Sequence, residues 1–347
     1  MRIESVSARI PSLEISNARI IDEIGQFNHD QPARVVERYQ RKVLHLLKKA
    51  GSKTRYFRDK ANNETALNLA KSAMEDALRR ADMKKSDIDL LIFCGVGRGF
   101  LEPANSYFCA NAMGMQCQCF DVIDACMSWV RSLEIAYNFF KSDRYRHIMI
   151  VNAEFTVYEY GYPELLKIKS SKQIDYTFPA YTIGEAATAT ILSKSDNKWS
   201  FDFESAPELV NLCTIPLKGY EGFCNGNGNV AMNGVNGFVS FGVELFDAAV
   251  QRMVTLNQKM VKDINEPDIW FPHAAALNAS MEAAEILGIQ PEKMYTNVFP
   301  KYGNVVSASI PLAMYMAINE ERLQRGKKVI LSPASAGMAF AVVQFEY

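Results

Sequence analysis

One of the seven cysteines in this chain stands where its sulfur would be reactive. Cys126 follows an apolar run, CFDVIDA, that is typical of a buried strand, and it opens CMSWVRSLEIAYNFFK, whose apolar residues recur at helical spacing. The first N–H groups of a helix and the positive end of its dipole would face this sulfur and favour thiolate over thiol. Thiolate is the nucleophilic form of cysteine. Cys126 is therefore the candidate nucleophile, and a buried junction cysteine is the alternative interpretation.

Two further polar residues lie where strands and helices are expected to meet. His273 ends the apolar run IWFPH, which would deliver it to the rim of a sheet, where open α/β folds bind ligands; a core histidine is the alternative. Asn304 precedes a helix in GNVVSASIPLA, a place where asparagine is also common as a cap. Cys126 occupies the equivalent elbow of the first half. This order predicts that the three side chains meet near a pseudo-twofold axis.

The elements that must position these residues occur twice. Helical and strand patterns alternate along the chain, and the order recurs at an offset of roughly 180 residues, which predicts a duplicated α/β unit. Continuous apolar runs such as DLLIFCG and RHIMIVNAE favour sheets covered by helices on both faces. The polar stretch SKSDNKW marks the boundary, so that residues 1–195 form an N-terminal half with Cys126 and residues 196–347 a C-terminal half with His273 and Asn304.

Composition excludes several classes of protein. The 347 residues carry 38 basic and 39 acidic side chains, which argues against a nucleic-acid binder. No stretch approaches the roughly 20 apolar residues of a membrane span, and the start MRIESVSARIPSLEIS is no secretion signal, so a cytoplasmic location is expected. An odd number of cysteines without zinc-type spacing predicts neither a disulfide framework nor a metal site.

Four segments in order resemble the beta-ketoacyl-ACP synthase III (FabH-like) branch of the thiolase superfamily: DACMSW around Cys126, FPHAAA around His273, GNVVSASIPLA around Asn304, and the terminal SAGMAFAVVQF. The resemblance implies the duplicated five-layer αβαβα fold and a homodimer. It implies that an acyl thioester acylates Cys126, while His273 and Asn304 polarise the carbonyl of the second substrate in a Claisen condensation. The backbone N–H groups of Cys126 and Ala336 would form the oxyanion hole. Thioesters of CoA or an acyl carrier protein would be the substrates, with no permanently bound cofactor.

The chain also departs from the pattern of that branch. Bulky residues replace small ones after the nucleophile, at Met127–Trp129. After the histidine, Ala274 and Ala276 replace the usual Gln and Asn, and Asn278 stands where a basic residue is expected. The Trp and Arg that grip CoA have no clear match around His45–Lys49, and the glycine-rich C-terminal turn is reduced to SAG. These departures favour specialised fatty acid or polyketide-like metabolism over housekeeping fatty acid initiation.

A second resemblance concerns Glu102. The segment RGFLEPANS resembles the matching loop of OleA-type enzymes, which join two fatty acyl-CoAs head to head. There the glutamate before the proline reaches into the partner subunit's site as a base. Glu102 is therefore a candidate base for non-decarboxylative condensation, since a carboxylate can remove an α-proton. An exposed loop glutamate beside a turn proline is the alternative.

Two more functions stay open. One transfers the acyl group to an alcohol or amine of a natural product, with His273 as general base. The other is a silent subunit paired with an active homologue, which the presence of Cys126 disfavours. The segment Gly226–Gly237 lacks the strand-before, helix-after setting of a phosphate-binding loop and is predicted to be a hairpin connection, and Glu185 is assigned no catalytic role.

Overall fold

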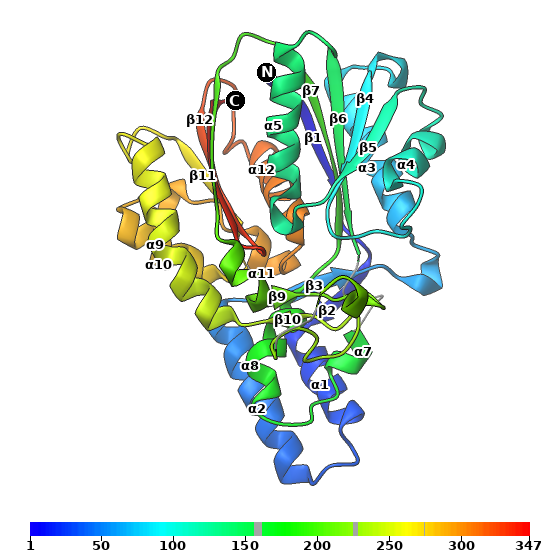
Figure 1. Ribbon diagram of the computed structural model, residues 1–347, viewed down its shortest axis with the longest axis vertical. Coiled ribbons are helices and arrows are strands. Elements are labelled where there is room, and N and C mark those ends of the chain that lie inside the picture. Colours follow the sequence, from blue (N-terminus) through cyan, green and yellow to red (C-terminus); the bar gives the residue numbers. More distant parts are fainter. Residues whose placement is uncertain (156–161, 225–227, 274) are drawn as a thin grey trace.

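Two five-stranded sheets form the body of the molecule (Figure 1). The computed structural model describes residues 1–155, 162–224, 228–273 and 275–347. The first sheet has the order β1-β7-β6-β4-β5. Its strands are β1 (Arg2–Arg9), β4 (Leu90–Cys94), β5 (Gln118–Val122), β6 (His147–Glu154) and β7 (Ala186–Ser193). In the second sheet β14 lies between β12 and β8, and β11 pairs with β12. Its strands are β8 (Trp199–Ser205), β11 (Ile269–Pro272), β12 (Lys328–Ser332), β13 (Ala334–Ser335) and β14 (Ala339–Glu346).

The second sheet repeats the strand order and directions of the first. The sequence β1-β7-β6-β4 corresponds to β8-β14-β12-β11: the first two pairings are antiparallel and the third is parallel in both sheets. At the place that corresponds to β5, the second sheet has only a single parallel bridge, between Trp270 and Met294. The topology is thus that of two like units, with the second unit shortened at one edge.

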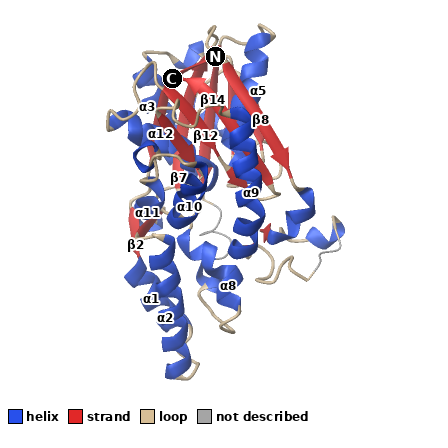
Figure 2. Cartoon of the chain, turned by 90° about the vertical axis from the view of Figure 1, so that its left-hand side faces the viewer, coloured by secondary structure: helices blue, strands red, loops and turns tan. Residues whose placement is uncertain are grey.

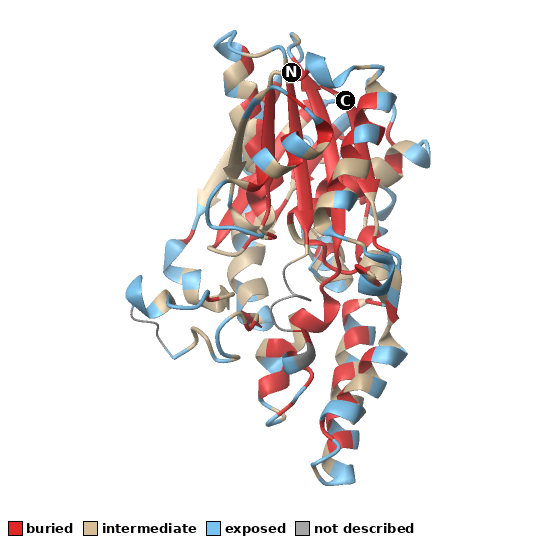
Figure 3. Ribbon diagram, turned by 90° about the vertical axis from the view of Figure 1, so that its right-hand side faces the viewer, coloured by how far each residue is buried: buried red, intermediate tan, exposed pale blue. Residues whose placement is uncertain are grey.

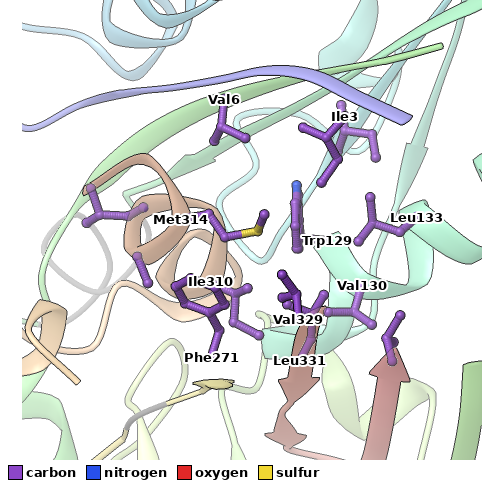
Figure 4. Close-up of a cluster of buried hydrophobic side chains, with 14 of the residues drawn as sticks. Ile3, Val6, Trp129, Val130, Leu133, Phe271, Ile310, Met314, Val329 and Leu331 are labelled. Atoms are coloured by element: carbon purple, nitrogen blue, oxygen red, sulfur yellow. The ribbon is translucent and has the colours of Figure 1, made fainter. Parts of the chain in front are cut away.

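Helices cover both faces of each sheet, which gives the five-layer αβαβα arrangement expected from the sequence. The outer face of the first sheet carries α3 (Ala66–Ala81) and α4 (Asn105–Met113). Between the sheets lie α5 (Ser128–Lys141) and α12 (Ser309–Asn319), packed around Trp129 and Met314 (Figure 4). The outer face of the second sheet carries α9 (Gly242–Met260) and α10 (Leu277–Leu287) (Figure 2). Because helices bury β4 and β6 from both sides, these strands consist of continuous apolar runs.

A third group of elements lies below the sheets (Figure 1). An antiparallel pair of helices projects there, and the short β2 and β3 pair beside it. This group comprises β2 (Leu13–Ser16), α1 (Asn17–Phe27), α2 (Ala33–Ala50), β3 (Thr54–Phe57), α7 (Tyr162–Leu165), α8 (Gln173–Thr177), β9 (Cys213–Thr214), β10 (Val239–Ser240) and α11 (Val298–Tyr302). The sequence interpretation had assigned no elements to the α1–α2 region, although α2 is strongly amphipathic and ends on a left-handed Gly51.

Candidate active site

Cys126 lies on a tight turn between β5 and α5. The turn Ala125–Met127 is a single 3₁₀ turn, and Ala125 has a positive φ of 44°, which is strained for a residue with a side chain. Ser128 holds the turn from inside: its Oγ accepts from the Asp124 N–H at 2.8 Å and donates to the Ala125 carbonyl at 2.7 Å. The strained residue therefore presents Cys126 just ahead of the first turn of α5, as the sequence predicted.

Asn304 lies two residues ahead of the corresponding turn of the second half. The turn Val306–Ala308 precedes α12, and Val306 has a φ of 51°, an outlier for a β-branched residue. Position for position, Ser307 rather than Asn304 corresponds to Cys126, since each is the central residue of its 3₁₀ turn. Asn304 thus lies at the equivalent elbow of the second half, three residues ahead of the position that corresponds to Cys126.

Hydrogen bonds fix the backbone and one side-chain atom of Asn304. Its N–H donates to the Thr182 carbonyl at 2.8 Å, and its carbonyl accepts from the Gly184 N–H at 3.0 Å. A Cβ on Gly303 would lie 2.2 Å from the Thr182 carbonyl oxygen, so only glycine allows this approach of the two segments. The Oδ1 of Asn304 accepts from the Val306 N–H at 2.9 Å. Nδ2 makes no hydrogen bond to any described residue and is left as a donor.

His273 follows the last residue of β11 and is partly buried. Burial lowers its pKa to about 4, so the imidazole is neutral at physiological pH. Nδ1 is buried and has no hydrogen-bond partner among the described residues. A buried N–H without an acceptor costs about 1–3 kcal/mol, so the proton belongs on Nε2, where a ligand can accept it. The geometry therefore favours an imidazole that donates from Nε2.

The elements that carry these residues meet at one end of the two sheets. The turn of Cys126 contacts the turn Val306–Ala308, which starts two residues after Asn304. The Met127 N–H donates to Ser335 Oγ at 3.2 Å, which ties the same turn to β13. β11 runs parallel to β12 with Pro272 opposite Ser332, so His273 emerges beside the segment that leads to Ser335. The turn of Cys126, the turn that follows Asn304 and the end of β11 thus lie at the same end of the two sheets.

Burial controls the protonation of Cys126. It raises the pKa of the half-buried thiol well above its usual range, and the nearby ionisable groups Cys213 and Glu154 raise that pKa further. The Cys126 backbone N–H and Ser335 act in the opposite direction. The sequence interpretation expected the helix terminus to favour thiolate. In the resting chain this expectation is wrong, because loss of hydration outweighs the few N–H dipoles near the sulfur.

A buried carboxylate, not predicted from the sequence, ties the second turn to the segment that follows β4. Glu154, at the end of β6, accepts from the N–H groups of Val96 and Gly97 at 3.2 Å and 3.1 Å. It also accepts from the N–H and, through a short hydrogen bond, from the Oγ of Ser307. Burial raises the pKa of Glu154, while these four donors act against the rise. A charged residue closing an otherwise apolar strand, VNAE, was the available signal.

The predicted oxyanion donors lie on the two turns that Ser335 joins. Ala336 sits between β13 and β14 and is partly buried. Within the described residues, neither its N–H nor that of Cys126 donates to a backbone carbonyl, so both are available to a ligand.

The bulky residues after the nucleophile are core residues. Met127 and Trp129 are fully buried, and Trp129 Nε1 donates to Thr190 Oγ1 at 3.1 Å. Glu102 is exposed, in a loop whose neighbours Phe100 and Leu101 are also exposed. Glu185 is buried and forms an ion pair with Arg58 at 3.0 Å, as a structural residue would.

Other sequence predictions fall partly outside the described residues. Ala274 lies outside them, as do residues 225–227 of the glycine-rich segment. The rest of that segment lies in the connection between β9 and β10, which pair antiparallel. All seven cysteines are free thiols. Over residues 1–155, 162–224, 228–273 and 275–347, no group of three or more His, Cys, Asp or Glu side chains is placed to hold a metal ion. No helix in this described part has the length and apolarity to cross a membrane.

Known proteins resemble this chain in sequence and in fold. Residues 257–347 match the family described as 3-Oxoacyl-[acyl-carrier-protein (ACP)] synthase III C terminal. Beta-ketoacyl-[acyl-carrier-protein] synthase III of Aquifex aeolicus is 25% identical, over 83% of this chain and 86% of its own. The enzyme of the same name from Aliarcobacter butzleri is 26% identical, over 99% of this chain and 96% of its own.

Two solved structures share the fold. OleA of Xanthomonas campestris with bound lauric acid and lauroyl-CoA has a TM-score of 0.83 at 20% identity, covering 99% of this chain and 98% of its own. The Aquifex aeolicus synthase III has a TM-score of 0.79 at 21% identity, covering 100% and 99%.

Proposed function

Because the chain is a FabH-like member of the thiolase superfamily and an acyltransferase of the condensing type, we propose that it joins an acyl group held on Cys126 to the carbanion of a malonyl thioester. The hydrogen-bond donors of the site, on His273 and Asn304, are the observation that supports this proposal. Burial keeps His273 neutral, the proton is inferred to be on Nε2 because Nδ1 has no partner among the described residues, and Asn304 Nδ2 donates to no described residue. Two neutral donors suit an enolate oxygen, which gains negative charge during the reaction.

In the first step Cys126 exchanges one thiol for another. The sulfur attacks the carbonyl carbon of an acyl thioester, and the bond between that carbon and the CoA or carrier sulfur breaks. The proton lost by Cys126 ends on the departing thiol, so the exchange is neutral overall. The N–H groups of Cys126 and Ala336 bind the oxyanion of the tetrahedral intermediate. Since burial favours the thiol in the resting protein, the thiolate forms only as the substrate is attacked.

In the second step the malonyl thioester loses carbon dioxide. The two electrons of the broken C–C bond pass to the α-carbon, and the enolate oxygen accepts hydrogen bonds from His273 Nε2 and Asn304 Nδ2. The α-carbon then attacks the acyl carbon on Cys126, the bond from that carbon to the sulfur breaks, and the departing thiolate takes up a proton from water to restore the thiol. A 3-oxoacyl thioester is the product. No group has to remove a proton from the second substrate, which agrees with the low pKa of His273.

The tautomer of His273 separates this function from acyl transfer to an alcohol or amine. A general base for an acceptor hydroxyl needs an unprotonated nitrogen facing the substrate. Placing the proton on Nδ1 instead would leave a buried N–H without a partner. A silent subunit is also disfavoured, since a subunit without activity would need neither the Nε2 donor of His273 nor the Nδ2 donor of Asn304.

The decisive experiment is intact-protein mass spectrometry with a panel of acyl-CoAs. We expect one acyl adduct on the wild-type chain, no adduct on Cys126→Ala, and an unchanged adduct on Cys224→Ala, which removes an exposed thiol. An adduct that survives on Cys126→Ala would refute the nucleophile. Malonyl and plain acyl thioesters are then compared as second substrates, and turnover with malonyl thioester alone supports decarboxylative condensation.

We propose that the active form is a homodimer paired along β5. This strand is the edge of its sheet and is only partly buried, whereas β4 is fully buried. Exposed apolar side chains surround it: Phe100, Leu101, Tyr107 and Ile123. Leu101→Asp should give monomers by light scattering, and a dimer that persists would contradict this interface.

Glu102 lies in the same exposed region, which favours a second candidate function. In a dimer this carboxylate would enter the partner's site and act as base for a plain acyl-CoA, as in OleA-like condensation. Product formation from two plain acyl-CoAs that is lost in Glu102→Gln would establish this function. Turnover restricted to malonyl thioester would eliminate it.

The two halves, 1–195 and 196–347, contribute the nucleophile and the donor pair respectively, and we propose that they act as one catalytic unit.

We further propose a specialised fatty acid or polyketide-like pathway in the cytoplasm, because the CoA-gripping residues are unmatched around His45–Lys49 and Asn278 replaces an expected cation. Thioesters would be delivered without any permanently bound cofactor. Acyl-CoA profiling tests the substrate range.

A further inference from the structure

Ser335 is a buried serine at the end of the short strand β13. It pairs with Ala339 of β14, and only 4% of it is exposed. The strands of the two sheets are largely buried as well (Figure 3). The FabH-like branch has a glycine-rich turn here, whereas this chain reads SAG at 335–337, so the hydroxyl is a departure of this chain. A hydroxyl at this depth requires hydrogen-bond partners, because burying an unpaired polar group is unfavourable.

The two backbone partners of this hydroxyl flank Cys126. The Met127 N–H donates to Ser335 Oγ at 3.2 Å, and Ser335 Oγ donates to the Asp124 carbonyl at 3.3 Å. These two groups lie one residue after and two residues before Cys126, on the same 3₁₀ turn. The oxygen of Ser335 is therefore held against the turn that presents the nucleophilic sulfur.

The proton of this hydroxyl is free to change its acceptor. At 3.3 Å its hydrogen bond to the Asp124 carbonyl is long for an O–H donor, for which about 2.7–2.8 Å is usual. That carbonyl also accepts from the Met127 N–H at 2.8 Å, so it keeps a donor when the hydroxyl turns away. A serine proton moves by rotation about the C–O bond, while the oxygen stays in place. Turning the proton therefore leaves neither backbone group without a partner.

The sulfur of Cys126 is the neighbouring atom that gains charge in the proposed reaction. Burial raises the pKa of this thiol well above its usual range, and hydrogen bonds from the Cys126 backbone N–H and from the Ser335 side chain act against the rise. The backbone N–H is also the expected oxyanion donor once a substrate is bound, which leaves the hydroxyl to the sulfur. A thiolate occurs twice in the proposed reaction, when the sulfur attacks and when its bond to the acyl carbon breaks.

From these contacts we infer that the Ser335 hydroxyl turns from the Asp124 carbonyl to Cys126 Sγ and stabilises the thiolate in both steps. The inference rests on the proposed function and deepens it by assigning the donor that serves the sulfur. No covalent bond of Ser335 changes: its oxygen keeps its own proton and still accepts from the Met127 N–H. A hydrogen bond to an ionised acceptor is stronger than one to a neutral acceptor, so this donor favours the thiolate over the thiol.

A purely structural role of Ser335 predicts a different change. If the hydroxyl only held the turn, its loss would loosen the turn and admit water to the sulfur. Hydration would then lower the pKa of Cys126 and speed its alkylation, or leave the rate unchanged if the turn kept its shape. If the hydroxyl stabilises the thiolate, its loss slows alkylation at every pH below that pKa. The direction of the change in rate therefore distinguishes the two roles.

The experiment measures alkylation of Cys126 by iodoacetamide between pH 7 and 9, followed by mass spectrometry of the peptide that contains it. The variants are Ser335→Ala and Ser335→Gly, and the second removes the side chain as a glycine-rich turn would. The matched control is Ser132→Ala, which removes a buried hydroxyl of α5 that donates to the Ser128 carbonyl at 2.8 Å. Melting temperatures report folding, and acylation by acyl-CoA is measured on the same preparations.

We expect both Ser335 variants to be alkylated about threefold to tenfold more slowly at a fixed pH, because the loss of a hydrogen bond to the charged sulfur raises its pKa by about one unit or more. Each rate should be reached at a correspondingly higher pH, and acylation by acyl-CoA should slow as well. Ser132→Ala should be alkylated at the wild-type rate. Unchanged or faster alkylation of a folded Ser335 variant, or an equal loss in the control, overturns the assignment. Slower alkylation of the Ser335 variants together with no acylation of the wild-type chain supports the donor and contradicts the proposed function.

Discussion

The two halves build the same elbow and use it differently. In each, a non-glycine residue with positive φ, Ala125 or Val306, opens a 3₁₀ turn that leads into a helix between the sheets. The central residue of the first turn is Cys126, half-buried, whereas that of the second is Ser307, buried and bonded to Glu154. The first turn therefore carries the proposed nucleophile, whereas the hydrogen bond from Ser307 to Glu154 fixes the second turn.

The difference shows how a duplicated unit becomes asymmetric. Ser307 anchors the second turn, and the proposed enolate donor lies three residues earlier, at Asn304, whose Nδ2 donates to no described residue. Glu154 comes from the first half and holds the second turn through Ser307, so each half supports the reactive residue of the other. The two halves share a strand topology, and a few polar contacts distinguish their turns.

The largest effect on acylation is expected from substitutions of Cys126 and Ser307, the central residues of the two turns. In Cys126→Ser the hydroxyl is a far poorer nucleophile, and we expect acylation to fall by about 10³-fold or more. Adding Ser307→Cys to Cys126→Ala should not restore an adduct, because that position is buried and bonded to Glu154. Mass spectrometry of both variants decides. An adduct on the relocated thiol would show that the elbows are interchangeable.

Removing the donor of the second elbow should separate the two steps. Asn304→Ala loses one enolate donor, and we expect condensation with malonyl thioester to fall by about 10²–10³-fold. Acylation of Cys126 should change little, since its oxyanion donors are backbone N–H groups. The two rates are measured on the same preparation. A parallel loss of both would assign Asn304 a purely structural role.

The buried imidazole of His273 predicts that the folded chain loses stability in acid. Its pKa falls from 6.5 to about 4 in the folded chain, so the unfolded chain takes up a proton that the folded chain refuses. Stability is therefore lost as pH falls from 6.5 towards 4, by up to about 3 kcal/mol. His273→Gln should flatten this dependence in urea unfolding at pH 7 and 4.5. His45→Gln, which changes an exposed histidine, is the control and should keep it.

The smallest effect is expected from a substitution of the buried carboxylate, Glu154. The charge of Glu154 raises the pKa of Cys126, so Glu154→Gln should lower that pKa and increase the thiolate fraction at a fixed pH below it. We expect alkylation of Cys126 by iodoacetamide at pH 8 to accelerate about threefold to tenfold. Its pH profile should move to lower pH. An unchanged profile together with a lower melting temperature would leave Glu154 as a structural anchor alone.

Local patterns predicted the layers and the elbow residues, because both depend on periodicity. The apolar run LLIFC and the position of Cys126 before a helical pattern needed no long-range information. The pKa of Cys126 and the role of Glu154 were beyond such reasoning. Both depend on burial and on contacts such as Glu154 to Ser307, which are 153 residues apart. The α1–α2 projection carries no chemical motif, and its signal in the sequence is the amphipathic pattern of α2.

The placement of β14 has a consequence for synthesis on the ribosome. This strand, residues Ala339–Glu346, is hydrogen-bonded to β12 on one side and to β8 on the other. The second sheet therefore stays divided until nearly the whole chain has emerged, whereas every strand of the first sheet precedes residue 194. The first half is expected to gain protease resistance on shorter stalled nascent chains, and the second only on chains long enough to have β14 outside the ribosome.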